Sequence, residues 1–240
     1  MMNLNERIQV PIIARTRQRI PRKAMIEQAN LTYGERTLFS KNISSIYLVA
    51  ELGEATMHIR EYVNDSYCYA SIFILEINLK QRNDLSVINE KLQQAFPNPV
   101  VIIYQYEEDN IVSLASKRIN KLDNTKTVIE ELILEETDLE EIKLSSFKDD
   151  NLKIFYEDMI EYLYKLRIMK LIGVMPVKHI DYKNIIKTVD MLNTQIKQLE
   201  VEYKKEIMQA KKASIDEMLY NKEVELNQVI KNLQEDISNG

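Results

Sequence analysis

The sequence predicts an α+β fold, in which a mixed β-sheet with a crossover helix is followed by a long helical C-terminal region. Three observations lead to this prediction. The 240 residues contain only 4 Gly and 5 Pro, which favours long helices over a turn-rich sandwich. Residues 68–106 have the pattern of a strand, an amphipathic helix and a second strand, and residues 181–237 contain neither Gly nor Pro. We therefore expect a head domain over residues 1–145 and a helical tail over residues 146–240.

The composition is that of a globular protein, with 45% hydrophobic and 29% charged residues. The formal net charge of −5 provides no overall attraction to nucleic acid or to an anionic membrane. The single cysteine, Cys68, cannot form an internal disulfide, so we expect a reducing, cytoplasmic setting. No stretch approaches the ~18 uncharged apolar residues of a transmembrane helix, and no apolar signal region precedes Arg15. We therefore expect no membrane partner.

The head domain is predicted to begin with two short helices. Pro21 stands near the first turn of one helix, and Thr32 with Glu35 forms the capping box of a second helix that runs to about Asn42. Strands and one amphipathic helix follow. The expected strands are Ser45–Leu52, Met57–Val63, Cys68–Leu79, Val100–Tyr106, Ile111–Arg118 and Val128–Leu134, and the helix covers residues 83–95. A strand, a helix and an apolar strand in this order indicate a right-handed crossover between parallel strands.

The tail is predicted to form a coiled coil over residues 181–237, because apolar residues recur there with alternating steps of three and four. The residues expected to mediate association are Ile185, Val189, Leu192, Ile196, Leu199, Tyr203, Leu226 and Leu233. The repeat changes phase near Glu206 and Glu217, which we interpret as a stutter in one helix. Such a helix would be roughly 85 Å long, so it needs a partner helix. A fold-back of residues 152–172 would cover only its first half.

The N-terminal segment is basic and a later segment is acidic. The candidate nucleic-acid contacts in the basic segment are Arg15, Arg17, Arg19, Arg22 and Lys23. The acidic segment contains Glu130, Glu131, Glu135, Glu136, Asp138, Glu140 and Glu141. The basic side chains either bind phosphates or pair with this acidic segment, and the sequence leaves both open.

The remaining residues that could bind a ligand or react are two basic residues, the cysteine and the two histidines. Lys117 and Arg118 are adjacent basic residues that either contact a phosphate or pair with Glu130 and Glu131. Cys68 is expected to be a small core residue rather than a nucleophile. The histidines, His58 and His179, are far apart and lack the neighbours of metal ligands.

The strongest strand turns polar at its end, where Glu76, Asn78 and Lys80 follow apolar residues on the same face. A carboxylate in that position is costly unless it is paired, hydrated or bound to a cation. Ligand sites also favour the carboxyl ends of strands in sheets with crossover helices. Glu76, Asn78 and Lys80 are therefore the best candidate site by geometry, and ordinary surface charges on a strand that emerges into solvent are the alternative.

The helix and strand order over residues 32–106, with Glu76-x-Asn78-x-Lys80 on the third strand, resembles the core of the PD-(D/E)xK nuclease superfamily. In that superfamily an acid on the second strand and a Glu-x-Lys on the third hold Mg²⁺ and activate water. The resemblance implies Glu76 and Lys80 as catalytic residues, and Glu61, Asp65 and Glu76 as candidate metal ligands. Asn78 stands where the superfamily has its lysine, so Lys80 would have to reach back from two positions on.

Several segments in a fixed order resemble an uncharacterised bacterial family, a domain of unknown function. They are Ile20-Pro21-Arg22-Lys23, Leu31-Thr32 with Leu38-Phe39, residues 75–80, residues 113–118 and Val128-Ile129-Glu130-Glu131. Members resemble accessory proteins encoded beside helicases and DNA methyltransferases in bacterial defence or mobile islands. The resemblance implies DNA-associated work and assigns no catalytic residue.

The function we expect is that of a non-enzymatic accessory or adaptor subunit that assembles through residues 181–237. Its partner would be a second copy or a larger protein, such as a helicase or methyltransferase, and DNA is a further expected partner. The alternatives are a metal-dependent nuclease and a nucleic-acid-binding module that uses the basic N-terminal segment. Only the nuclease would need a cofactor, Mg²⁺.

Overall fold

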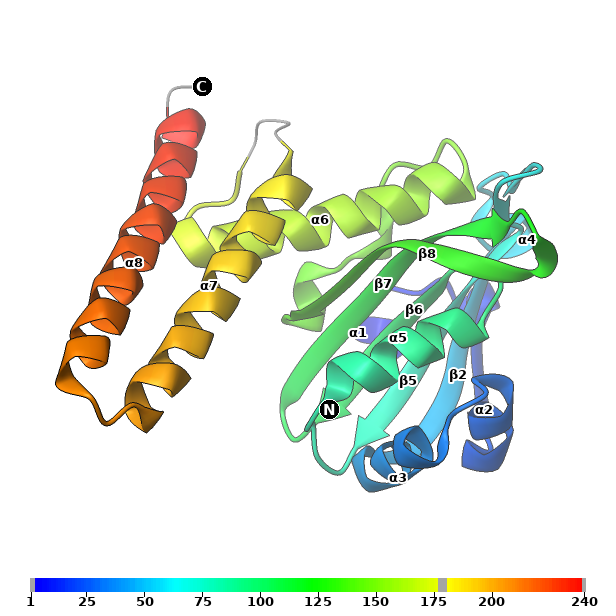
Figure 1. The fold of residues 1–240 in the computed structure, drawn as a ribbon. Coiled ribbons are helices and arrows are strands. Elements are labelled where there is room, and N and C mark those ends of the chain that lie inside the picture. The colour runs from blue at the N-terminus through cyan, green and yellow to red at the C-terminus, as the bar shows by residue number, and fades with distance from the viewer. Residues whose placement is uncertain (1–2, 177–180, 239–240) are drawn as a thin grey trace. The chain divides into compact units, whose positions relative to one another are not determined.

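The computed structural model describes residues 3–176 and 181–238, and the chain divides into two units, residues 1–160 and 161–240 (Figure 1). The strands of the first unit are β1 Arg15–Ile20, β2 Ile43–Gly53, β3 Tyr62–Val63, β4 Cys68–Tyr69, β5 Ser71–Leu79, β6 Val100–Tyr106, β7 Asp109–Asn120 and β8 Asp123–Glu136. Its helices are α1 Leu4–Arg7, α2 Arg22–Gln28, α3 Tyr33–Asn42, α4 Glu54–Met57 and α5 Leu85–Ala95. Helix α6, Leu152–Ile172, begins in the first unit and ends in the second.

The first unit is built on a mixed six-stranded sheet with the strand order β1-β2-β5-β6-β7-β8. Strands β5 and β6 are parallel and are joined by α5, whereas the other neighbouring strands are antiparallel. The predicted mixed sheet with a crossover helix is therefore confirmed. The predicted boundaries of β6 are those of the structure, because Pro99 precedes this apolar run and Glu107 has a positive φ directly after it.

One face of the sheet is covered by α2, α3 and α5. Met25 of α2, Phe39 of α3 and Leu92 of α5 are fully buried, and they pack in one core with the side chains of Leu75 and Ile102. Polar groups fix α5 on the sheet as well. Gln93 donates to the carbonyl of Val100 at 3.3 Å and to the hydroxyl of Ser113 at 3.0 Å. The helix that connects the two parallel strands is thus held by apolar packing and by buried hydrogen bonds.

Both helix starts that the sequence predicts near the N-terminus are confirmed. Thr32 and Glu35 form the capping box of α3, and Pro21 is the N-cap residue of α2. The predicted strand Met57–Val63 is wrong for most of its length. Met57 is the last residue of α4, in which the Thr56 hydroxyl accepts from the N–H of Gly53. Residues 58–61 lie in no strand, and only Tyr62 and Val63 pair with β4.

The second unit contains α7 Tyr182–Lys205 and α8 Gln209–Ser238, and these helices pack against each other as a hairpin (Figure 1). The predicted single helix over residues 181–237 is therefore wrong. The chain leaves the helix at Glu206, whose backbone is extended with ψ 139°. The Glu206 carboxylate then accepts from the N–H groups of Ile207 and Met208, which satisfies backbone donors of the turn directly before α8. These bonds hold the pKa of Glu206 below its usual value.

The hairpin uses much of the apolar seam within the chain. Val189, Leu192 and Leu233 are buried, and Ile185, Ile196, Leu199 and Leu226 are half-buried. Tyr203 remains 37% exposed. The argument that the tail needs an external partner along its whole length is thus wrong, because α8 supplies the partner helix for α7.

Truncation of Leu192 tests this hairpin. Leu192 is 0% exposed, so Leu192→Ala should lower the stability of the second unit by about 2–5 kcal/mol. The loss should be the same at low and high protein concentration, because both helices belong to one chain. Hydrogen exchange of the amides in α7 and α8 measures it. Met191→Ala is the control, since Met191 is 49% exposed. A loss that vanishes at high concentration would show an intermolecular pairing instead.

Candidate functional site

The candidate site lies where β5 changes from apolar to polar. Leu75 and Ile77 point into the helix-covered core, whereas Glu76 and Asn78 lie on the opposite face. The sheet register places Tyr47 of β2 beside Glu76. It also places Ser45 and Gln105 on either side of Asn78. Three neighbouring strands therefore bring polar side chains to the same end of one face.

These side chains form the wall of a cleft of about 1010 Å³, which we call the Glu76 cleft. Its lining residues are Asn3, Leu4, Arg7, Arg17, Ser45, Tyr47, Glu76, Asn78, Leu79, Gln105, Glu107, Glu108, Asn110 and Glu140. The side chain of Glu76 is 8% exposed. Because a buried carboxylate is costly without partners, the groups around it decide what the cleft can do.

Glu76 has one charged and one neutral partner. Its Oε1 lies 3.8 Å from the Arg17 guanidinium and accepts from the Asn78 amide at 3.3 Å. Asn78 also donates to the hydroxyl of Ser45 at 3.0 Å. The guanidinium of Arg17 stacks on the ring of Tyr47, 4.8 Å from its centroid. Glu76 is thus part of a polar network rather than a surface charge emerging into solvent.

The Glu76 cleft has the chemistry of a polar binding site. It contains the cations Arg7 and Arg17 together with glutamates, carboxamides and a hydroxyl. Within residues 3–176 and 181–238, no three His, Cys, Asp or Glu residues gather closely enough to hold a metal ion. Such a cleft offers both hydrogen-bond donors and acceptors to a polar ligand.

The structure does not bring the predicted nuclease residues together. Glu61 and Asp65 are exposed beside the separate two-stranded sheet of β3 and β4, and neither lines the Glu76 cleft. The Lys80 ammonium donates to the carbonyl of Ser40 at 3.1 Å and also lies outside the cleft. His58 is exposed, and His179 lies outside the described residues.

The basic N-terminal segment is a strand at the edge of the sheet, which the sequence did not reveal. Arg15 donates to the carbonyl of Val10 at 2.8 Å, and Arg17 pairs with Glu76. Arg19 and Arg22 line a second, smaller cavity, and Lys23 is exposed. Pairing with the acidic segment occurs at another arginine, Arg7, which lies 3.0 Å from Asp138.

Lys117 and Arg118 have opposite environments. Arg118 pairs with Glu130 at 3.4 Å, so the predicted pairing with the acidic segment is confirmed for this residue. Lys117 is 3% exposed and donates to the carbonyls of Phe96 and Asn98 at 3.1 and 3.3 Å. It is too deeply buried to meet a phosphate. Its burial lowers the pKa of its amine to about 7.

Lys117 ties the end of α5 to β7. The two carbonyls that it binds lie in the chain directly after α5, where backbone acceptors lack helical partners. The sequence signal was the small residues Ser113 and Ala115 on the same strand face, which are fully buried in the structure. Alternation along the strand places Lys117 on the same face as these two buried residues.

Comparison with known proteins gives a family without an activity. Residues 8–237 match the model of DUF4391, a domain of unknown function. The chain therefore belongs to this family, as the resemblance to an uncharacterised domain family predicted. No curated protein and no solved structure matches the chain. Within residues 3–176 and 181–238, no helix is long and apolar enough to cross a membrane.

The buried amine of Lys117 predicts a pH-dependent stability. The pKa is about 7 in the folded protein against the usual 10.5, so the unfolded chain binds more protons between these values. Stability should therefore rise with pH, by up to about 1.4 kcal/mol per unit. The comparison is with Lys117→Met in urea denaturation at pH 7 and pH 9. The free energy of unfolding of Lys117→Met relative to the wild type should be higher at pH 7 than at pH 9, because only the wild type gains stability as the pH rises. The same relative free energy at both pH values would contradict the prediction.

Proposed function

We propose that the protein is a non-enzymatic accessory subunit that assembles through its C-terminal helices with a DNA-remodelling or DNA-modifying enzyme in bacterial defence. The setting that we propose is cytoplasmic, in keeping with the lone cysteine. One observation carries the proposal. The turn of the α7–α8 hairpin presents large apolar side chains to solvent, although α7 and α8 already pack against each other.

The exposed residues at the turn, which we call the hairpin tip, are Val201, Tyr203, Ile207 and Met208. Their exposed fractions are 49%, 37%, 90% and 58%. Single exposed apolar residues are normal, but four within eight positions of one turn are typical of an interaction site. Met residues adapt to many partner surfaces because their side chains are flexible. The hairpin tip can therefore insert into an apolar groove.

The charges around the hairpin tip indicate the rim of that groove. Lys204, Lys205, Lys211 and Lys212 flank the turn. Lys212 lies 5.3 Å from the ring centroid of Tyr203, and Lys211 lies 4.0 Å from Glu206. Because Glu200, Glu202 and Glu206 lie among these lysines, the rim carries both charges. It therefore fits a groove whose rim carries complementary acidic and basic groups, which fixes the register of the complex.

In this proposal the coiled coil forms between α7 and α8 of one chain, and not between two chains. The heptad spacing of Ile185, Val189, Leu192 and Leu199 supports coiled-coil packing of α7 on α8. Association with a second copy or with another protein would then use the hairpin tip and not the buried seam. Leu192→Asp, which places a charge in the seam, would disrupt the hairpin itself and cannot test association.

The alternative function is a metal-dependent nuclease with a PD-(D/E)xK-like core and Mg²⁺. Glu76 opens into a large cleft, as that function needs, but Lys80, Glu61 and Asp65 lie outside this cleft. We therefore expect no cleavage of DNA by the isolated chain when Mg²⁺ is added. Gel electrophoresis of plasmid DNA measures this. Cleavage that disappears in Glu76→Gln would establish the nuclease and contradict our proposal.

Substitution at the hairpin tip tests the assembly function. Ile207→Asp should abolish a complex, because a charge enters the apolar contact, and it should leave folding intact because Ile207 is 90% exposed. The complex is sought by light scattering of the purified chain and by co-purification with the products of neighbouring genes. Leu122→Asp is the matched control, since Leu122 is 98% exposed in the β7–β8 turn. Equal complex formation by Ile207→Asp and the wild type would overturn the proposal.

A further inference from the structure

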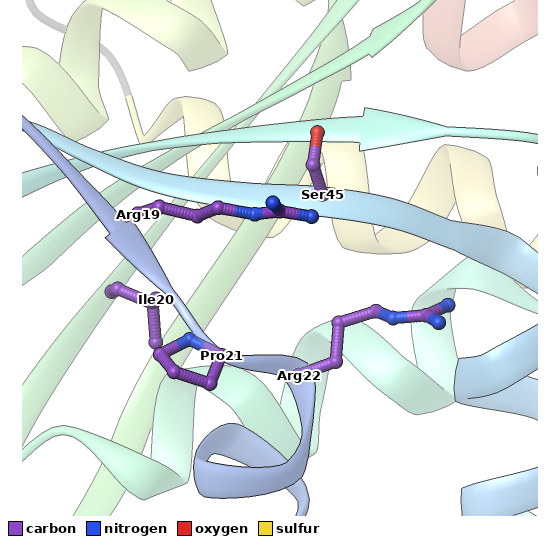
Figure 2. A pocket seen from close by; sticks show the side chains of 5 residues that line it. All are labelled: Arg19, Ile20, Pro21, Arg22 and Ser45. Atoms are coloured by element: carbon purple, nitrogen blue, oxygen red, sulfur yellow. The ribbon is translucent and has the colours of Figure 1, made fainter.

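A second cavity lies at the end of β1, beside the Glu76 cleft. It has a volume of about 310 Å³ and is lined by Arg19, Ile20, Pro21, Arg22 and Ser45. Figure 2 shows the side chains of Arg19 and Arg22 extending in the same direction beside this cavity. Ser45 lines both cavities, so they are neighbours on the sheet. We call the smaller one the arginine cavity.

The arginine cavity carries positive charge that the described part of the chain does not neutralise. Arg19 is exposed, and its guanidinium has no hydrogen-bond or ion-pair partner among residues 3–176 and 181–238. Arg22 donates one N–H to the carbonyl of Ile43 at 3.0 Å, which leaves other guanidinium donors available. The lining of the cavity contains no carboxylate. Two guanidinium groups thus face a space that an anion can enter.

Ser45 adds a neutral donor to these charges. Its hydroxyl oxygen accepts from the Asn78 amide at 3.0 Å, so its own hydrogen is free to turn toward a ligand in the cavity. Two guanidinium groups and a hydroxyl make up a donor set that suits the several oxygens of a phosphate. A carboxylate has only two oxygens and would leave part of this donor set unused.

We propose that the arginine cavity binds a phosphate of a nucleic-acid backbone. The surrounding charge favours a polymer over a small anion. Arg15, whose guanidinium is bound only by a neutral carbonyl, lies on the same edge strand as Arg19. Lys23 follows Arg22 on the surface, and no acidic residue occurs between Arg7 and Glu27. Pro21 is exposed and provides an apolar surface against which a sugar can pack. This contact is independent of sequence, because it involves phosphate oxygens rather than base edges.

This proposal does not depend on the hairpin tip. Of the candidate phosphate contacts in the basic N-terminal segment, it assigns the role to Arg19 and Arg22, since the side chains of Arg15 and Arg17 already have partners within the protein. Lys117 and Arg118 are not assigned as phosphate contacts, because Lys117 is buried and Arg118 is paired with Glu130. Binding by the chain should therefore be modest and strongly dependent on salt.

The experiment measures binding of a fluorescent single-stranded oligonucleotide to the full chain by anisotropy at several salt concentrations. Arg19→Gln should weaken binding about tenfold, because one charge-assisted contact is lost. It should also reduce the slope of log K against log salt by about 0.7. Arg60→Gln is the matched control. Arg60 is exposed and lines neither the arginine cavity nor the Glu76 cleft, and the change in net charge is the same.

Competition identifies the source of the phosphate. Inorganic phosphate and a nucleoside monophosphate are added at equal concentration to the complex with the oligonucleotide. Competition only by an unlabelled oligonucleotide supports the backbone contact that we propose. Displacement by either small anion at a comparable concentration would replace it with a site for a free phosphate. Absence of binding at low salt, or an equal loss in Arg19→Gln and Arg60→Gln, would overturn the proposal.

Discussion

The structure depends on the position of β5 between an antiparallel and a parallel neighbour. Parallel pairing with β6 requires a crossover, and α5 provides it across one face of the sheet. That face must then be apolar along the whole strand, as Leu75 and Ile77 are. The other face is free to turn polar at Glu76 and Asn78. The location of the candidate site therefore follows from the side of the sheet on which the crossover packs.

The elements that were predicted correctly from the sequence are those whose structure depends on a few neighbouring residues. The capping box of Thr32 and Glu35, the apolar run of β6 and the alternation of β5 each express a preference of a few neighbouring residues. The end of α7 was missed because it contains neither Gly nor Pro. A glutamate side chain ends this helix by accepting from the next two N–H groups, and the heptad pattern registers only a change of phase there. An uninterrupted helix and a hairpin therefore share one hydrophobic pattern.

The candidate site was predicted in part for a similar reason. Glu76 stood out because a carboxylate interrupts an apolar strand face, and its burial bears out that reasoning. Its partner did not stand out, because β1 is an edge strand whose residues 16–19 are all exposed. Such a strand has no alternation of polar and apolar residues from which to read it. The contact between Arg17 and Glu76 joins parts of the chain that only the sheet brings together.

The pairing of Glu76 with Arg17 also explains how a protein of net charge −5 can keep a positively charged edge. Arg19 is the register partner of Tyr47, and Tyr47 is the partner of Glu76 in turn. Glu76 is nevertheless occupied by Arg17, which also covers the ring of Tyr47. Glu76 is paired with Arg17 at 3.8 Å, and no carboxylate lines the arginine cavity. Arg19 and Arg22 therefore keep their positive charge because Glu76, the buried carboxylate nearby, is paired with Arg17. Arg19, Tyr47 and Glu76 occupy matching register positions on three neighbouring strands, so the arginine cavity and the Glu76 cleft lie on one face of the sheet.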